Sequence, residues 1–325
     1  MKLFPGLDDA FLDVIRVRIA GDPMRQGVRW TNYSLRRIAQ ELEGRGFRIS
    51  TWIVRRLLKR HRLGRRRARK TQTIKRHRDR DRQFHRIAQW RVTYEGSPNP
   101  VISMDTKKKE LIGKFFRAGT AYTDDPELAW DHDFPSLATG VVFPHGFYDC
   151  QRNVAHINLG ISHDTSEFAC DSLVAWWNKH GQMAYPHATS ILLLCDGGGS
   201  NASSRYVFKY WLERAADRIG KEIRIAHYPP YASKYNPIEH LLFPHVTLAC
   251  QGVIFQSVEM VREQMSETRT SKGLRTTVDI LSGDYETGLK APKDYKKNMR
   301  IVFDDELPAW NYRAVPSDET PKTGS

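Results

Sequence analysis

Apolar positions near the start of the chain follow helical spacing. From residue 35 to residue 42, apolar side chains recur at 35, 38, 39 and 42, which is the stripe of an amphipathic helix, and Ser34 is a suitable N-cap. A turn with two glycines at 44–46 interrupts the pattern. A second helix is predicted from Ser50 or Thr51, with Ile53, Val54, Leu57 and Leu58 on one side. Two short helices around a tight turn resemble a helix-turn-helix.

From residue 101 onward the pattern becomes that of strands alternating with helices. Strands are predicted at 101–105, 146–150, 154–161, 190–195 and 223–228. Helices are predicted after Thr165 to about residue 181, from about 204 to 218, and from near Pro237. The order β-β-β-α-β-α-β-α is that of an α/β, ribonuclease H-like fold, a mixed sheet flanked by helices. In that fold the first and fourth strands are neighbours.

Turn-forming residues at 95–100 indicate a linker between these two patterns. We therefore predict a basic, all-α helix-turn-helix region with its linker at 1–95. A ribonuclease H-like domain is predicted at 96–315, followed by a polar tail at 316–325.

The distribution of charged residues along the chain indicates the kind of partner it binds. The 325 residues carry a formal net charge of +14, but residues 1–90 alone hold 25 basic and 8 acidic side chains, and the remainder is slightly negative. A basic module on a near-neutral body predicts a polyanionic partner. The longest apolar run, at 191–195, is far below the roughly 20 residues of a membrane helix. With no signal-like start and four widely spaced cysteines, we expect a soluble cytoplasmic protein that keeps its thiols reduced.

The second predicted helix carries a basic face opposite its apolar stripe. Its members are Arg55, Arg56, Lys59 and Arg60. A helical hairpin with a solvated charged face is the alternative interpretation, but the basic run at 65–70 and further basic residues out to Arg86 favour DNA binding. Such a run neutralises many phosphates and gives salt-sensitive affinity.

Three carboxylates are predicted to meet in the second domain. Asp105 and Asp196 end the first and fourth strands, and a helix after the fifth strand carries Glu239. Like charges at short range raise one another's pKa, so converging carboxylates need a cation. Two Mg²⁺ ions, with Mn²⁺ as an alternative, suit hard oxygen ligands and phosphodiester chemistry. Each carboxylate alone also fits an ordinary turn or helix cap.

Several neighbouring residues have two interpretations each. Directly after Asp105, three lysines either bind phosphate or are ordinary exposed lysines: Lys107, Lys108 and Lys109. Just before Glu239, three polar residues either contact DNA or only shape the loop: Ser233, Lys234 and Asn236. A His between two acids is either a fourth metal contact or part of a surface loop: Asp131, His132 and Asp133. The pair Trp176 and Trp177 is predicted to be core rather than a base-stacking platform.

Four segments resemble the DDE transposases. The sequence Pro-Pro-Tyr-Ala-Ser-Lys-Tyr-Asn-Pro-Ile-Glu-His at 229–240 is similar to the third acidic motif of that group, including the mariner superfamily. The segments at 105–113, 131–134 and 196–201 bring the resemblance closer to a bacterial insertion-sequence group, the ISAzo-thirteen family. It spans about residues 22–312.

The resemblance implies a metal-dependent transposase acting on the terminal inverted repeats of its own element. Asp105, Asp196 and Glu239 match the acidic triad of the family. The implied chemistry is hydrolysis to a 3′-hydroxyl and attack of that hydroxyl on target DNA. The implied partners are double-stranded DNA at element ends and target, and at least a second copy of the chain, in the bacterial cytoplasm at the nucleoid. A ribonuclease H-like nuclease without joining activity and a catalytically inactive DNA-binding derivative are the alternatives.

Overall fold

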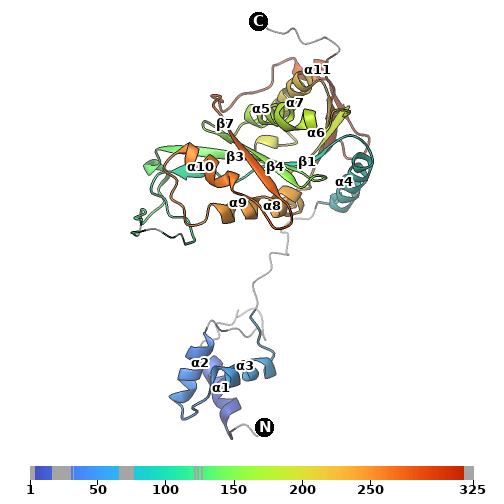
Figure 1. Ribbon diagram of the computed structural model, residues 1–325. Helices are drawn as coiled ribbons and strands as arrows, with labels where there is room; N and C mark the ends of the chain where they lie inside the picture. The colour runs from blue at the N-terminus through green and yellow to red at the C-terminus, as the bar shows by residue number, and fades with distance from the viewer. Residues whose placement is uncertain are drawn as a thin grey trace. The chain divides into compact units, whose positions relative to one another are not determined.

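The computed structural model describes two compact units. The residues described are 4–16, 31, 33–65, 77–120, 122, 124–125 and 127–317. The units are Met1–Gln72 and Thr73–Ser325, and each is considered by itself (Figure 1). Most of the predicted basic run at 65–70 and of the predicted tail at 316–325 lies outside the described residues.

The N-terminal unit contains three helices, α1 (Leu7–Arg16), α2 (Leu35–Glu43) and α3 (Thr51–Arg60). The two predicted helices are confirmed as α2 and α3. The hydroxyl of Ser34 accepts a hydrogen bond from the backbone N–H of Arg37 at 3.1 Å, as expected of an N-cap. Helix α1 was not predicted, although its buried residues follow helical spacing. It completes a core that consists of Leu7, Phe11, Val14, Ile15, Ile38, Leu42, Val54 and Leu57.

The larger unit is built on one sheet flanked by helices. Its strands are β1 (Val101–Thr106), β2 (Glu110–Ile112), β3 (Gly140–Asp149), β4 (Val154–Gly160), β5 (Ser190–Cys195), β6 (Glu222–His227), β7 (Arg275–Leu281), β8 (Ile301–Phe303) and β9 (Asn311–Ala314). Its helices are α4 (Arg80–Glu95), α5 (Ser166–Trp176), α6 (Gln182–Ala184), α7 (Tyr206–Ile219), α8 (Pro237–Leu241), α9 (Phe243–Ala249), α10 (Val258–Ser266) and α11 (Tyr295–Asn298). Shorter 3₁₀ turns lie at Pro135–Leu137, Gly199–Asn201 and Ser233–Tyr235, and a π-helical turn at Trp177–Gly181 continues α5.

Strand order confirms the ribonuclease H-like prediction. The order is β7-β4-β3-β1-β5-β6-β9-β8, with β2 paired to β3. β1 pairs antiparallel with β3 and parallel with β5, and β5 pairs parallel with β6. The first and fourth predicted strands are therefore neighbours, as expected. The three-residue strands β2 and β8, the four-residue β9, and β7 were not predicted. β3 begins at Gly140, six residues before the predicted start.

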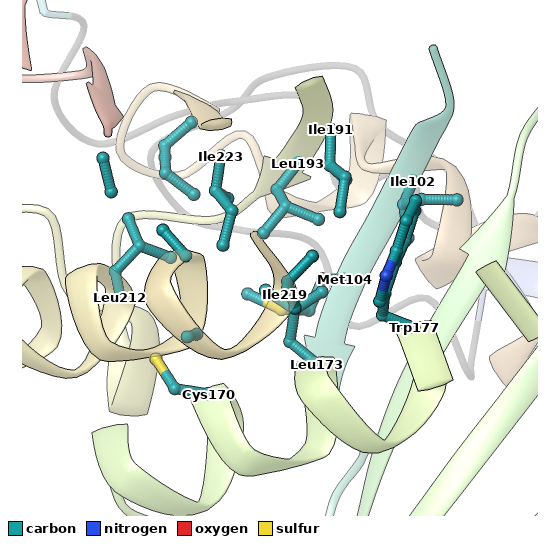
Figure 2. Packing of buried hydrophobic residues seen from close by; sticks show 14 of the residues in the cluster. Ile102, Met104, Cys170, Leu173, Trp177, Ile191, Leu193, Leu212, Ile219 and Ile223 are labelled. Atoms are coloured by element: carbon teal, nitrogen blue, oxygen red, sulfur yellow. The ribbon is translucent and has the colours of Figure 1, made fainter. Parts of the chain in front are cut away.

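The two faces of the sheet are covered by different helices. On β5, Ile191 and Leu193 point into the cluster formed with α5 and α7, whereas Leu192 and Leu194 belong to the cluster under α4. Figure 2 shows the first cluster, in which Leu173 and Leu212 from the two helices meet the sheet residues. Trp176 and Trp177 are buried there, so the prediction that they are core residues is confirmed.

Within the residues that the structure describes, every helix is too short or too polar to cross a membrane. The four cysteines are free thiols, with Cys170, Cys195 and Cys250 buried and Cys150 half-buried, as predicted.

Helix α4 belongs to the larger unit rather than to the N-terminal one. Its fully buried Gln83 donates a hydrogen bond to the backbone oxygen of His227 at 2.9 Å and exchanges two with the Asn311 amide, at 3.0 and 2.7 Å. Near its other end the hydroxyl of Tyr94 lies 2.7 Å from that of Ser190. The division between compact units consequently falls at 72/73 instead of the predicted 95, because α4 buries one face on the sheet.

Replacing Gln83 tests this attachment. In Gln83→Leu the His227 carbonyl and the Asn311 amide lose their buried partner, which costs about 1–3 kcal/mol. We expect urea unfolding of the full chain to show that loss in the transition of the larger unit. Gln89→Leu, an exposed site on the same helix, is the matched control and should change stability by less than about 0.5 kcal/mol. Equal stability of the two variants would contradict the attachment.

Candidate active site

Three carboxylates converge at one edge of the sheet. Asp105 lies near the end of β1 and Asp196 directly follows β5, and because these strands are parallel their carboxyl ends share that edge. Burial, together with the nearby negative charges of Asp196 and Glu239, raises the pKa of Asp105 to about 8. A hydrogen bond between Asp105 and Glu239 acts in the same direction, whereas one from the Thr106 N–H to Oδ1 of Asp105, at 2.8 Å, opposes it. The structure thus brings the three predicted carboxylates into one interacting group.

A buried hydrogen-bond network places Glu239 in this group. The Ser103 hydroxyl on β1 donates to Oδ1 of Asn236 at 2.5 Å and accepts from the backbone N–H of Ile238 at 2.9 Å. The Asn236 amide in turn donates to the backbone oxygen of Met104 at 3.2 Å. Ser103 and Asn236 are fully buried. They join the start of α8 to β1, so Asn236 shapes the loop.

The close approach of α8 also depends on a glycine. Gly146 on β3 lies opposite Asp105 in the sheet register. A Cβ atom at this position would lie 2.9 Å from Cδ1 of Ile238 and 3.1 Å from Cε1 of Phe243. A larger side chain here would therefore require the Ile238 and Phe243 side chains, or the helices that carry them, to shift.

His227 supports the segment that carries Asp196. Its Nδ1 lies 2.9 Å from the backbone oxygen of Asp196, and its Nε2 lies 2.8 Å from the hydroxyl of Tyr312. A carbonyl only accepts, so Nδ1–H donates to Asp196 and Nε2 accepts from Tyr312. Burial lowers the pKa of His227 to about 4, which keeps the ring neutral. Sequence reasoning missed both residues, because Tyr312 reaches β6 only through the antiparallel pairing of β9 with it.

The donor chemistry of the triad suits a hard divalent cation. All three side chains offer carboxylate oxygens, the ligands that Mg²⁺ prefers. A cation among them would also offset the repulsion that raises the pKa of Asp105. Asp105, Asp196 and Glu239 are the residues that would hold it. Across the residues that the structure describes, no three His, Cys, Asp or Glu side chains are grouped tightly enough to form a ready-made metal site.

The basic residues of α3 lie on its exposed face. Val54 and Leu57 are buried, and the four basic residues named for DNA binding are exposed. The Arg56 guanidinium lies 4.8 Å from the ring centroid of Trp52, which is itself half exposed. Arg60 forms an ion pair with Asp8 of α1, so part of its charge is already compensated. DNA contact by Arg55, Arg56, Lys59 and Arg60 stays a prediction.

The lysines after Asp105 differ from one another. The Lys107 side chain is 11% exposed, and its ammonium lies 2.6 Å from Oε1 of Glu110, which also pairs with Arg117 at 3.3 Å. Lys108 and Lys109 are exposed. Lys107 thus supports the turn into β2, and the two exposed lysines are better placed to meet a phosphate.

The remaining predicted residues lie in loops. Ser233 is half-buried, and its backbone oxygen accepts from the Asn236 N–H at 2.7 Å. Lys234 is exposed, with its ammonium 5.1 Å from the ring centroid of Tyr235. Their DNA contacts stay predictions.

The segment with a His between two acids is an exposed loop. Asp131, His132 and Asp133 are all exposed, and His132 pairs with Asp131 at 3.2 Å and stacks on Phe134. This agrees with the surface-loop interpretation.

Removing the Asp105 charge should stabilise the metal-free protein. The folded pKa, about 8, exceeds the unfolded value near 4, so folding favours the protonated acid. Stability therefore falls as the pH rises from about 4 to 8. We expect Asp105→Asn to gain on the order of 2 kcal/mol at pH 8 in EDTA, and less as the pH approaches 4, measured by urea unfolding. An Asp105→Asn protein no more stable than the native chain at pH 8 would show that the carboxylates do not interact.

Comparison with known proteins agrees with this geometry. A model of the family described as the Rhodopirellula transposase DDE domain matches residues 10–316. No curated protein sequence shows significant similarity to the chain. Among solved structures, the Mos1 transposase paired-end complex with left transposon end is similar at 14% identity, covering 82% of this chain and 72% of that one, with a TM-score of 0.46.

A second solved structure is similar to about the same extent. The mariner Mos1 paired end complex with Mg is 16% identical, again covering 82% of this chain and 72% of that chain, with a TM-score of 0.45. The family model extends over nearly the whole sequence, including all three converging carboxylates. The chain therefore belongs to the DDE transposases of the ISAzo-thirteen, or Rhodopirellula transposase DDE, family.

Proposed function

We propose that this protein is a transposase that binds the terminal inverted repeats of its insertion sequence and catalyses metal-dependent strand cleavage and strand transfer. The observation that carries the proposal is the interaction of Asp105 with both Asp196 and Glu239 at one edge of the sheet. Three interacting carboxylates from separate elements suit cations and phosphodiesters better than a structural role.

Each residue of the site has a distinct task in this proposal. Asp105, Asp196 and Glu239 would hold two Mg²⁺ ions, with Mn²⁺ as an alternative. When bound, such ions polarise phosphoryl oxygens and activate the attacking oxygen. Ser103 and Asn236 hold α8 so that Glu239 faces Asp105. Lys108 and Lys109 neutralise phosphate charge beside the site.

The proposed reaction consists of two in-line displacements at phosphorus. In cleavage, water attacks a phosphodiester at the element end. A bond forms between phosphorus and the oxygen of the water, and the bond between phosphorus and the 3′-oxygen breaks. The products are a 3′-hydroxyl and a 5′-phosphate. In joining, that 3′-hydroxyl attacks a target phosphodiester and displaces the 3′-oxygen of the target strand.

DNA recognition is assigned to the N-terminal unit. Residues 1–72 hold 19 basic and 6 acidic side chains, which is nearly all of the net charge of +14, and α3 presents an exposed basic face. Phosphate neutralisation by such a face gives affinity, and α3 would supply base contacts in the major groove. Because two element ends must be paired, we propose at least a dimer on DNA, acting at the nucleoid in the bacterial cytoplasm.

Substitution of the triad tests the chemistry. Asp105→Asn, Asp196→Asn and Glu239→Gln should each lower the rate of Mg²⁺-dependent cleavage of terminal inverted-repeat DNA by about 1,000-fold or more, or roughly 4 kcal/mol. Binding of that DNA in gel-shift assays should persist. Asp149→Asn is the matched control, since Asp149 is a buried carboxylate at the far end of β3. Cleavage that survives any triad substitution would refute the proposal.

A joining assay separates the alternatives. Pre-cut terminal DNA supplied with a target plasmid should be integrated by the native protein. Cleavage without integration would identify a nuclease, and DNA binding without either reaction would identify an inactive derivative.

The salt dependence of binding tests the basic face of α3. The triple variant Arg55→Ala, Arg56→Ala, Lys59→Ala should lower the slope of log K against log salt by about 2 to 3, because each phosphate contact contributes about 0.9. The matched control is Arg37→Ala on α2, whose charge is already paired with Glu41 at 2.7 Å. An unchanged slope in the triple variant would place DNA binding elsewhere.

A further inference from the structure

A second polar group links the two chain segments that carry Asp105 and Asp196. Its centre is Asp164, which lies between β4 and α5. The Thr106 hydroxyl donates to Oδ1 of Asp164 at 3.2 Å, and the Ser200 side chain also forms a hydrogen bond with this carboxylate. Thr106 is the residue after Asp105, and Ser200 lies four residues after Asp196. One carboxylate therefore bridges both segments.

His145 also takes part in this hydrogen-bond network. Its Nδ1 lies 2.8 Å from the Thr106 hydroxyl. The proton of that hydroxyl is directed to Asp164, which as a carboxylate only accepts, so Nδ1–H of His145 must be the donor to Thr106. His145 is fully buried, and burial lowers its pKa to about 3. The neutral ring thus orients Thr106 towards Asp164.

The loop after Asp196 begins with three glycines. Gly197, Gly198 and Gly199 are exposed and have no side chain to pack. Ser200 is anchored by Asp164 and by the Ser166 hydroxyl, which donates to its backbone oxygen at 2.7 Å. Asp164 and Ser200 also line a cavity of about 300 Å³. These polar bonds at the edge of the cavity help to locate this part of the loop, in which Ser200 and Asn201 are buried.

We propose that Asp164 is a positioning residue: by joining Thr106 to Ser200 it sets the separation of Asp105 and Asp196 at which a divalent cation binds. The inference rests on the proposed function, since it concerns the same site. Asp164 itself does not contact the reacting atoms. Residues that orient ligands in this way commonly change metal affinity 10- to 100-fold when they are altered.

The test measures Mn²⁺ binding to the DNA-free full-length protein by electron paramagnetic resonance. In Asp164→Asn one acceptor oxygen is replaced by an NH₂ donor, so Thr106 and Ser200 no longer share a carboxylate. We expect the dissociation constant for Mn²⁺ to rise about tenfold. Thr106→Val should produce a similar rise, and Thr106→Ser should restore much of the affinity. The double variant Asp164→Asn, Thr106→Val should lose little more than either single variant, because both break the same link.

Asp149→Asn is the matched control. Asp149 is also a buried carboxylate that accepts from a hydroxyl, that of Tyr185 at 2.8 Å, but it lies at the other end of β3. Its Mn²⁺ affinity should equal that of the native protein. In cleavage assays Asp164→Asn should need about tenfold more Mg²⁺ for half-maximal rate, and saturating Mg²⁺ should recover most of that rate.

The outcomes separate this inference from the proposed function. Native Mn²⁺ affinity in folded Asp164→Asn or Thr106→Val, or an equal loss in Asp149→Asn, would overturn the positioning role and leave the transposase proposal intact. If Asp164→Asn does not fold, Thr106→Val decides the matter alone. A native protein that neither binds Mn²⁺ nor cleaves DNA would overturn both.

Discussion

The arrangement of this protein depends on holding three carboxylates close together. Burial penalises the charge of Asp105, and the charges of Asp196 and Glu239 repel it, so the pKa of Asp105 is raised to about 8. Nothing local in the chain would produce such a group. It exists because parallel pairing of β1 with β5 brings two strand ends to one edge, and because the large apolar clusters on both faces stabilise that sheet.

Fully buried hydrogen bonds then give the site its shape. Ser103 and Asn236 attach α8 to β1, while His227 links Asp196 to Tyr312 on β9. Buried polar groups are costly unless they are paired, and pairing them allows few alternative geometries. The same interior that stabilises the sheet therefore also orients the acidic side chains. Charge is divided between the two units: residues 1–72 hold 19 basic and 6 acidic side chains, and the acidic site lies in the larger unit.

Much of the framework could be predicted from periodicity and end signals. The caps at Ser34 and Thr165 and four of the five predicted strands are found where the pattern places them, and the fifth, β3, begins six residues earlier than predicted. The missed strands β2, β8 and β9 have three or four residues, too few to show a period. The attachment of α4 was missed for another reason. Its docking residue, Gln83, is polar, and its partners Asn311 and His227 lie far along the chain.

The sequence alone determined the local elements, the basic character of the first quarter and the identities of the three carboxylates, because helix stripes, strand runs and motifs depend on near neighbours. Only the tertiary structure decided that Asn236 is a buried support, that Lys107 is paired with Glu110, and that Asp164 bridges Thr106 and Ser200. The physical reason is the separation along the sequence between the residues that interact. A hydrogen bond such as that between Ser103 and Asn236 joins residues 133 positions apart, and it forms only after the sheet has brought them together.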